Sequence, residues 1–138
     1  MPWPFFEMST AAKLVVRAQD MHRVKKDWGY EEWIVNNDRY CGKRLILQRG
    51  WQCSLHHHEI KHETFHIEDG KVRLELGDQV FILLPGDTVE IPVGVKHRFG
   101  GLQSSVIYEF STHHDDKDSY RTEGELSRSN SALLESPE

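Results

Sequence analysis

Residues 50–70 read GWQCSLHHHEIKHETFHIEDG, and this stretch holds five of the nine histidines of the chain. Side chains two residues apart point to the same face of an extended strand, so His56 and His58 should point the same way. By the same alternation Glu63 shares a face with Phe65, whose apolar ring favours the interior. A buried carboxylate is costly without a partner, and a metal ion removes that cost. The stretch therefore predicts three metal ligands, His56, His58 and Glu63.

A second stretch, residues 86–97 with the sequence GDTVEIPVGVKH, ends on a fourth candidate ligand. Pro92 and Gly94 predict a turn there, and His97 follows it. Three imidazoles and one carboxylate form a borderline nitrogen and oxygen set, which suits a divalent first-row transition metal such as Mn, Fe, Ni, Co or Zn. We therefore expect a metal cofactor bound by His56, His58, Glu63 and His97.

The remaining histidines are expected to take no part in this site. Strand alternation turns three of them outward, namely His57, His62 and His66. The other three fall in irregular segments, namely His22, His113 and His114.

Residues 28–111 consist of short β-type segments separated by turn residues, a pattern typical of a sandwich or barrel. We expect strands near residues 30–35, 43–48, 52–57, 63–68, 71–76, 79–83, 88–91, 97–99 and 104–111. Asp69-Gly70 predicts a two-residue hairpin, and Gly77-Asp78 repeats the signal. No apolar helical periodicity interrupts this region, which argues against a parallel α/β sheet. The predicted fold is a single all-β antiparallel barrel.

Length, charge and cysteine content narrow the class of protein. The 138 residues suit one domain, and a net charge of −5 without a basic face argues against a nucleic-acid partner. Apolar runs such as residues 81–84 are too short to span a membrane, and residues 1–20 lack a secretion signal. We therefore expect a cytoplasmic protein. Its two cysteines, Cys41 and Cys53, are expected to be reduced rather than bridged.

The chain is expected to divide into three parts. Residues 1–27 form an N-terminal arm, residues 28–121 form the barrel, and residues 122–138 form a mobile acidic and serine-rich tail. The arm carries Trp3, Phe5 and Phe6, which have no evident place in a closed barrel. Because docking onto a second subunit would bury them, we predict a homodimer.

The two stretches together resemble the cupin family. Residues 50–70 fit the first cupin motif, G(X)5HXH(X)4E(X)6G, and residues 86–97 fit the second, G(X)5PXG(X)2H. The second motif usually ends on an asparagine, where this chain has Gly101. The resemblance implies a jelly-roll fold, the double-stranded β-helix of cupins, with the metal ligands named above.

Two weaker traits narrow the resemblance. The Trp-Gly-Tyr stretch at residues 28–30 and the Glu-Phe-Ser-Thr stretch at residues 109–112 are similar to stretches of cupins related to type II mannose-6-phosphate isomerases and D-lyxose isomerases. In the latter, a lysine before the first motif and a glutamate on a late strand are catalytic. The resemblance implies these roles for Lys43 and Glu109.

The residues themselves leave alternatives open at both positions. Glu109 interrupts an apolar strand, which indicates either a polar cavity or an ion pair at an edge or subunit contact. Lys43 shares a face with Leu45 and Leu47, so its amine either reaches the cavity rim or lies solvated at the strand end.

The leading hypothesis is an aldose–ketose isomerase that moves a proton on a small sugar or sugar phosphate with help from a metal. The same ligands would also serve an Fe(II)-dependent dioxygenase, or a cupin that binds a sugar or nucleotide sugar without catalysis. A small-molecule partner is expected in each case, with no membrane partner.

Overall fold

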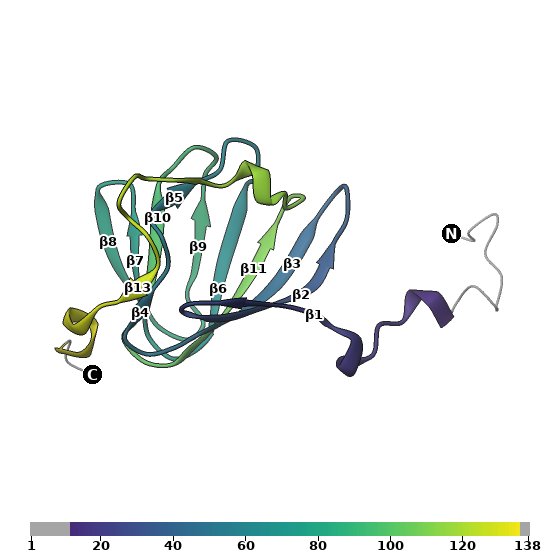
Figure 1. Ribbon diagram of the computed structural model, residues 1–138, viewed down its shortest axis with the longest axis horizontal. Coiled ribbons are helices and arrows are strands. Elements are labelled where there is room, and N and C mark those ends of the chain that lie inside the picture. The colour runs from purple at the N-terminus through teal and green to yellow at the C-terminus, as the bar shows by residue number, and fades with distance from the viewer. Residues whose placement is uncertain (1–11, 136–138) are drawn as a thin grey trace.

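The computed structural model describes residues 12–135, which form two antiparallel sheets (Figure 1). The first sheet has the strand order β1 (His22–Lys26), β2 (Gly29–Asn36), β3 (Cys41–Leu47), β11 (Ser105–Ser111), β6 (Glu63–Asp69) and β9 (Thr88–Ile91). The second has the order β12 (Tyr120–Arg121), β5 (His56–His57), β10 (His97–Gly101), β4 (Trp51–Gln52) and β13 (Arg128–Ser129). In addition, β7 (Val72–Leu76) pairs with β10 and with β8 (Gln79–Leu83).

The helical content of residues 12–135 is limited to short 3-10 turns. These are η1 (Ala12–Leu14), η2 (Ala18–Asp20), η3 (Asp116–Asp118) and η4 (Ser131–Glu135). No helix in this part of the chain is long and apolar enough to cross a membrane. The all-β antiparallel class is thus confirmed, and the two-sheet arrangement is that of a jelly roll.

Strand register gives the first sheet an inner surface that is apolar at one end and polar at the other. Leu45, Ile107 and Ile67 lie side by side on three neighbouring strands and are at most 1% exposed. Burying side chains of this size contributes about 1.5–3 kcal/mol each. Two residues further along the strands, Lys43 and Glu109 lie opposite each other, also facing inward. The core therefore occupies one end of the fold and leaves a polar inner surface at the other.

The strand expected over residues 52–57 is divided into β4 and β5. Between them, Leu55 forms backbone hydrogen bonds with the C-terminal segment: its N–H donates to Glu125 O at 3.0 Å, and its carbonyl accepts from Thr122 N at 2.9 Å. The backbone N–H and carbonyl of Leu55 therefore find their hydrogen-bond partners in the C-terminal segment rather than in a neighbouring strand of the sheet. His56 still pairs directly with His97 on β10.

The prediction of a hairpin at Asp69-Gly70 is wrong. The strand before it, β6, pairs with β11 and β9, while the strand after it, β7, pairs with β10 and β8. The link therefore crosses from one sheet to the other. Of the two turn residues, Gly70 has a positive φ, of 90°, and Asp69 does not. Gly77-Asp78 does form a two-residue hairpin, since Leu76 pairs with Gln79.

The two ends of the described chain pack differently. The predicted docking of Trp3, Phe5 and Phe6 on a second subunit concerns residues outside the described range. Strand β1 forms an antiparallel hairpin with β2. After β11 the chain passes over the end of the sheets and returns along the second sheet (Figure 1). There Leu133 is only 3% exposed and lies close to Gly100.

We expect Gly70→Ala to destabilise the fold far more than Gly86→Ala. Both glycines have positive φ, of 90° and 93°, which costs an alanine about 1–3 kcal/mol. A Cβ on Gly70 would also overlap the Ser104 carbonyl and lie 2.7 Å from Ser105 Cα, whereas a Cβ on Gly86 meets nothing within 4 Å. The extra overlap should cost about 1–3 kcal/mol more. Denaturant titration measures both losses, and equal losses would contradict this reading of Gly70.

Candidate metal centre

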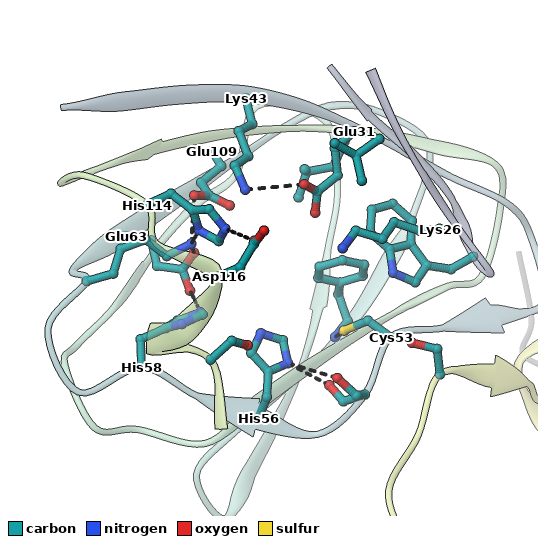
Figure 2. Close-up of a pocket in the computed structure, with 18 of the residues that line it drawn as sticks. Lys26, Glu31, Lys43, Cys53, His56, His58, Glu63, Glu109, His114 and Asp116 are labelled. Carbon is teal, nitrogen blue, oxygen red and sulfur yellow. Dashed lines mark hydrogen bonds and ion pairs between the residues drawn. The ribbon is translucent and has the colours of Figure 1, made fainter. Parts of the chain in front are cut away.

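Three imidazole rings, those of His56, His58 and His97, lie close together at the polar end of the fold. Figure 2 shows two of them, His56 and His58. His56 lies on β5, His58 follows it by two residues, and His97 begins β10 directly opposite His56. One ring nitrogen from each lies within 4.8 Å of the others. The alternation inferred from the sequence thus brings His56 and His58 to one side, and strand pairing adds His97.

Each ring is oriented by a hydrogen bond from its other nitrogen. The Nδ1 atoms of His56, His58 and His97 lie 2.8, 2.8 and 3.0 Å from the backbone carbonyls of Ser54, Asp118 and Val95. Because a carbonyl oxygen only accepts, each Nδ1 carries the hydrogen. In the neutral ring Nε2 then keeps a free lone pair, which is the tautomer that a metal-ligating histidine needs.

Glu63 faces these nitrogens from the first residue of β6. Its Oε2 lies 3.2 Å from His58 Nε2 and 3.0 Å from His97 Nε2. Glu63 Oε2 and His97 Nε2 are buried without a hydrogen-bond partner. With the hydrogens on Nδ1, both atoms are acceptors facing each other, an arrangement that is unfavourable unless a cation lies between them. The donor set therefore fits a divalent transition metal.

The His56 ring is suited to bind a metal at neutral pH. Burial lowers its pKa to about 3, with the charges of His97 and His58 acting in the same direction. The ring is consequently neutral at pH 7, and no proton has to be displaced from it before a metal binds.

The centre opens into a cavity of about 540 Å³, which is also lined by Lys43 and Glu109. Glu109 is 4% exposed, and its Oε2 accepts hydrogen bonds from Lys61 Nζ at 3.0 Å and Ser111 Oγ at 3.1 Å. Burial raises the pKa of Glu109 and the Glu63 charge adds to the rise, whereas Lys61 and Lys43 oppose it. Glu109 is thus a buried carboxyl of the cavity rather than an exposed edge residue.

Lys43 is almost completely buried, at 1% exposed. Its Nζ lies 3.2 Å from Glu31 Oε1 and 4.3 Å from the centre of the Trp33 ring. Glu31 Oε1 also accepts the Trp33 indole N–H at 2.8 Å. Burial alone would raise the pKa of Glu31, but the charges of Lys43 and Lys26 and the Trp33 hydrogen bond outweigh it and lower the pKa. The ammonium of Lys43 is therefore fixed inside the cavity.

Lys61 bridges the carboxylates of Glu63 and Glu109. Its Nζ lies 3.2 Å from Glu63 Oε1 and 3.0 Å from Glu109 Oε2, and the side chain is 3% exposed. Burial alone would lower the pKa of Lys61, but the two carboxylates outweigh it and raise the pKa. The lysine is therefore a fixed positive charge between two buried negative charges.

His114 lies in an irregular segment, as expected, but it also lines the cavity, so the expectation that it lies apart from the site was wrong. Its Nδ1 lies 2.9 Å from Lys61 Nζ and its Nε2 lies 2.7 Å from Asp116 Oδ1. An ammonium only donates, so Nδ1 accepts and Nε2–H donates to Asp116. Burial lowers the pKa of His114 to about 4, assisted by the charges of Lys61 and Lys43.

The three neighbouring histidines lie away from the metal-facing nitrogens. His62 is exposed and its Nε2 lies 2.6 Å from Glu90, and His66 bonds Thr88 Oγ1 at 2.9 Å. His57 is half-buried, because its ring stacks on Tyr120 of β12 at 5.3 Å.

Two further cavity residues carry a signal in the alternation of side-chain direction. Lys61 precedes β6 with the same parity as Glu63 and Phe65, and Glu31 shares its face of β2 with Trp33. His114 carries no such signal, because it lies in an irregular segment.

Comparisons with known proteins agree with this geometry. The family model described as the cupin domain matches residues 43–106. A D-lyxose/D-mannose isomerase from Thermosediminibacter oceani is 30% identical over 122 residues, which cover 68% of this chain and 67% of the relative. A D-lyxose ketol-isomerase from Cohnella laeviribosi is 32% identical over 106 residues, which cover 56% of this chain and 58% of the relative.

Solved structures support the same fold. The structure of KdgF from Halomonas sp. superposes with a TM-score of 0.66 at 16% identity, covering 73% of this chain and 94% of that chain. The chain thus spans roughly two thirds or less of the two isomerases, but nearly all of this structural neighbour. Motifs, fold and matches show that the chain belongs to the cupin superfamily and is related to the D-lyxose isomerases.

Proposed function

We propose that this chain is a metal-dependent aldose–ketose isomerase that acts on a small sugar. The observation that carries the proposal is the buried carboxyl of Glu109, which lines the same cavity as His56, His58 and Glu63. A binding site alone requires no carboxyl of raised pKa beside its metal ligands, whereas moving a proton between adjacent carbons requires an acid and base. The relationship to two isomerases supports the same choice.

His56, His58, His97 and Glu63 would hold the metal. A divalent ion there would supply Lewis acidity, polarising a carbonyl and the neighbouring hydroxyl of the sugar. The three hydrogen bonds from Nδ1 to backbone carbonyls fix the ring orientations beforehand. Glu63 divides its oxygens, with Oε1 toward Lys61 and Oε2 toward His58 and His97.

Glu109 would take the proton from one sugar carbon and return it to the next. Both of its hydrogen bonds, from Lys61 and Ser111, end on Oε2, which leaves Oε1 for the substrate. Burial raises its pKa, so the carboxylate is a stronger base than an ordinary glutamate. The two donors on Oε2 hold the group in one orientation, which limits the motion needed to reach the carbon.

Lys43 would bind the oxygen on which negative charge develops. An ammonium has three hydrogens to donate, and the salt bridge to Glu31 Oε1 uses one of them. Lys43 lies directly opposite Glu109 across the strand pair β3 and β11, so the two groups meet a bound molecule from neighbouring positions. A donor fixed in a buried site stabilises such charge without reorganisation.

The cavity suits a sugar in size and polarity. A volume of about 540 Å³ lies within the roughly 300–1,000 Å³ that small-molecule pockets occupy. Its lining is rich in charged and hydroxyl side chains, which match the hydroxyl groups of a carbohydrate.

The metal centre predicts selective loss of binding. His97→Ala and His56→Ala should abolish stoichiometric binding of Co²⁺, because each removes a buried nitrogen ligand. His57→Ala and His62→Ala should retain it, and they control for adventitious binding by histidines outside the proposed ligand set. Metal content after dialysis and the Co²⁺ absorption spectrum measure the outcome. Equal loss in all four variants would place the metal on the histidine-rich surface instead.

Glu109→Gln should lower isomerase turnover by about 10²–10⁴-fold, the usual contribution of a general base, while metal binding is kept. Assays on a panel of aldoses, with solvent deuterium exchange at the transferred carbon, measure the effect. Glu90→Gln is the matched control, since Glu90 is exposed and pairs with His62 outside the cavity.

Three results would contradict the isomerase proposal. The first is wild-type turnover by Glu109→Gln. The second is oxygen uptake that depends on Fe(II) while the sugar panel stays silent, which is the behaviour of a dioxygenase. The third is saturable sugar binding without turnover by the wild-type protein, which is the behaviour of a binding protein.

A further inference from the structure

The segment that follows the last long strand, residues 112–121, contacts the candidate metal ligands His56 and His58. It lies beyond the residues 43–106 that the cupin family model matches. In Figure 1 it crosses the end of the two sheets, carrying η3 over β6 and β11. Its last two residues form β12, which pairs Tyr120 with His57 and Arg121 with His56.

One residue of this segment, Asp118, holds the loop between two of the ligands. Its carboxylate accepts hydrogen bonds from three consecutive backbone N–H groups, of Glu59 at 2.9 Å, Ile60 at 3.2 Å and Lys61 at 2.9 Å. Asp118 is 6% exposed, so water has little access to replace these bonds. Charge-assisted hydrogen bonds of this kind are stronger than neutral ones. The path of the chain from His58 to Glu63 is therefore fixed by this carboxylate.

The backbone of the same residue orients a ligand. The Asp118 carbonyl accepts the Nδ1 hydrogen of His58 at 2.8 Å. That bond turns His58 Nε2 toward the other ligands. Because the carbonyl and the carboxylate belong to one residue, the ring orientation and the loop path are set together.

The segment that carries Asp118 is itself held in place by hydrogen bonds. Its backbone N–H donates to the Asp115 carbonyl at 2.9 Å, which closes the turn η3. Just before the turn, Thr112 exchanges two hydrogen bonds with His62: its N–H donates to the His62 carbonyl, and its hydroxyl accepts the His62 N–H, both at 3.1 Å. The segment thus contacts the ligand loop at both ends.

We propose that Asp118 is a positioning residue of the metal centre, which presets the His58 ring and the backbone from residue 59 to 61 for metal binding. The inference rests on the proposed metal site. It also places Lys61, whose backbone Asp118 holds, against Glu63 and Glu109. Loss of an outer-shell partner of a metal ligand typically weakens metal affinity about 10–100-fold.

The test compares Co²⁺ affinity in Asp118→Ala and Asp118→Asn with that of the wild type. Alanine removes all three acceptor contacts, whereas asparagine keeps one oxygen and places an amide N–H₂ against a backbone N–H. We expect the dissociation constant to rise about 10–100-fold for alanine and by less for asparagine, with a changed Co²⁺ ligand-field spectrum in both. Competition with a chelator measures the affinity.

Asp87→Ala is the matched control. Its carboxylate also accepts a backbone N–H, that of Leu84 at 2.8 Å, but in a turn away from the cavity. It should lower the melting temperature of the metal-free protein and leave both Co²⁺ affinity and spectrum unchanged. A merely structural role for Asp118 would give this same pattern in the Asp118 variants.

Wild-type affinity and an unchanged spectrum in Asp118→Ala, whatever its melting temperature, would overturn the inference. If the alanine variant does not fold, Asp118→Asn, which conserves side-chain volume, decides by the same two readouts. Absence of stoichiometric Co²⁺ in the wild type would overturn the metal centre itself. These two outcomes can be told apart, and neither measurement requires a sugar substrate.

Discussion

Neutralisation of buried charge is the constraint on which the polar end of this fold depends. Lys43, Lys61, Glu63 and Glu109 are each between 1% and 4% exposed. Removing one such ion from water costs several kcal/mol, so each must find an opposite charge nearby. Lys61 serves two carboxylates at once, and Lys43 is paired with Glu31. With its hydrogen on Nδ1, His97 Nε2 faces Glu63 Oε2 as a second acceptor, and a metal cation between the two atoms would remove the conflict.

The sheet register makes this arrangement possible without disturbing the core. The strands β3, β11 and β6 carry apolar inward residues toward one end, including Leu45 and Ile107, and polar ones toward the other. A well-packed apolar end stabilises the fold, so the polar end can keep a cavity whose groups are arranged for chemistry rather than for packing. Position along a strand therefore decides whether an inward residue supports the fold or lines the cavity.

Those parts of the site that follow strand periodicity could be predicted from the sequence. Alternation alone separates His56 and His58 from His57, and it turns Glu63 inward. The same alternation predicts that Lys61 faces inward, but lysine is so rarely buried that its residue type argues for an exposed position instead. The hairpin error at Asp69-Gly70 has a different origin. A turn signal shows that the chain reverses, whereas the choice of strand partner depends on distant segments, here β9, β10 and β11.

Asp118 and His114 show where sequence reasoning reaches its limit. Asp118 bonds the His58 ring and the loop after it from about sixty residues away in the chain, and His114 contacts Lys61 over a similar separation. Neither lies in a periodic element, so no repeat of apolar and polar positions marks it. Their positions follow from how the chain crosses the end of the sheets after β11.

The segment that crosses the end of the sheets after β11 also bears on which substrate the cavity would accept. The two sheets and the loop after β5 supply the candidate metal ligands, whereas the segment of residues 112–121 adds His114, Asp116, Ser119 and Arg121 to the cavity wall. Proteins that share one fold but differ in function differ in the residues that line their sites rather than in the residues of the core. Asp118 belongs to the same segment and bonds both the His58 ring and the loop after it. If the proposed roles are right, a substitution that displaced Asp118 would therefore affect the cavity wall and the metal ligands together.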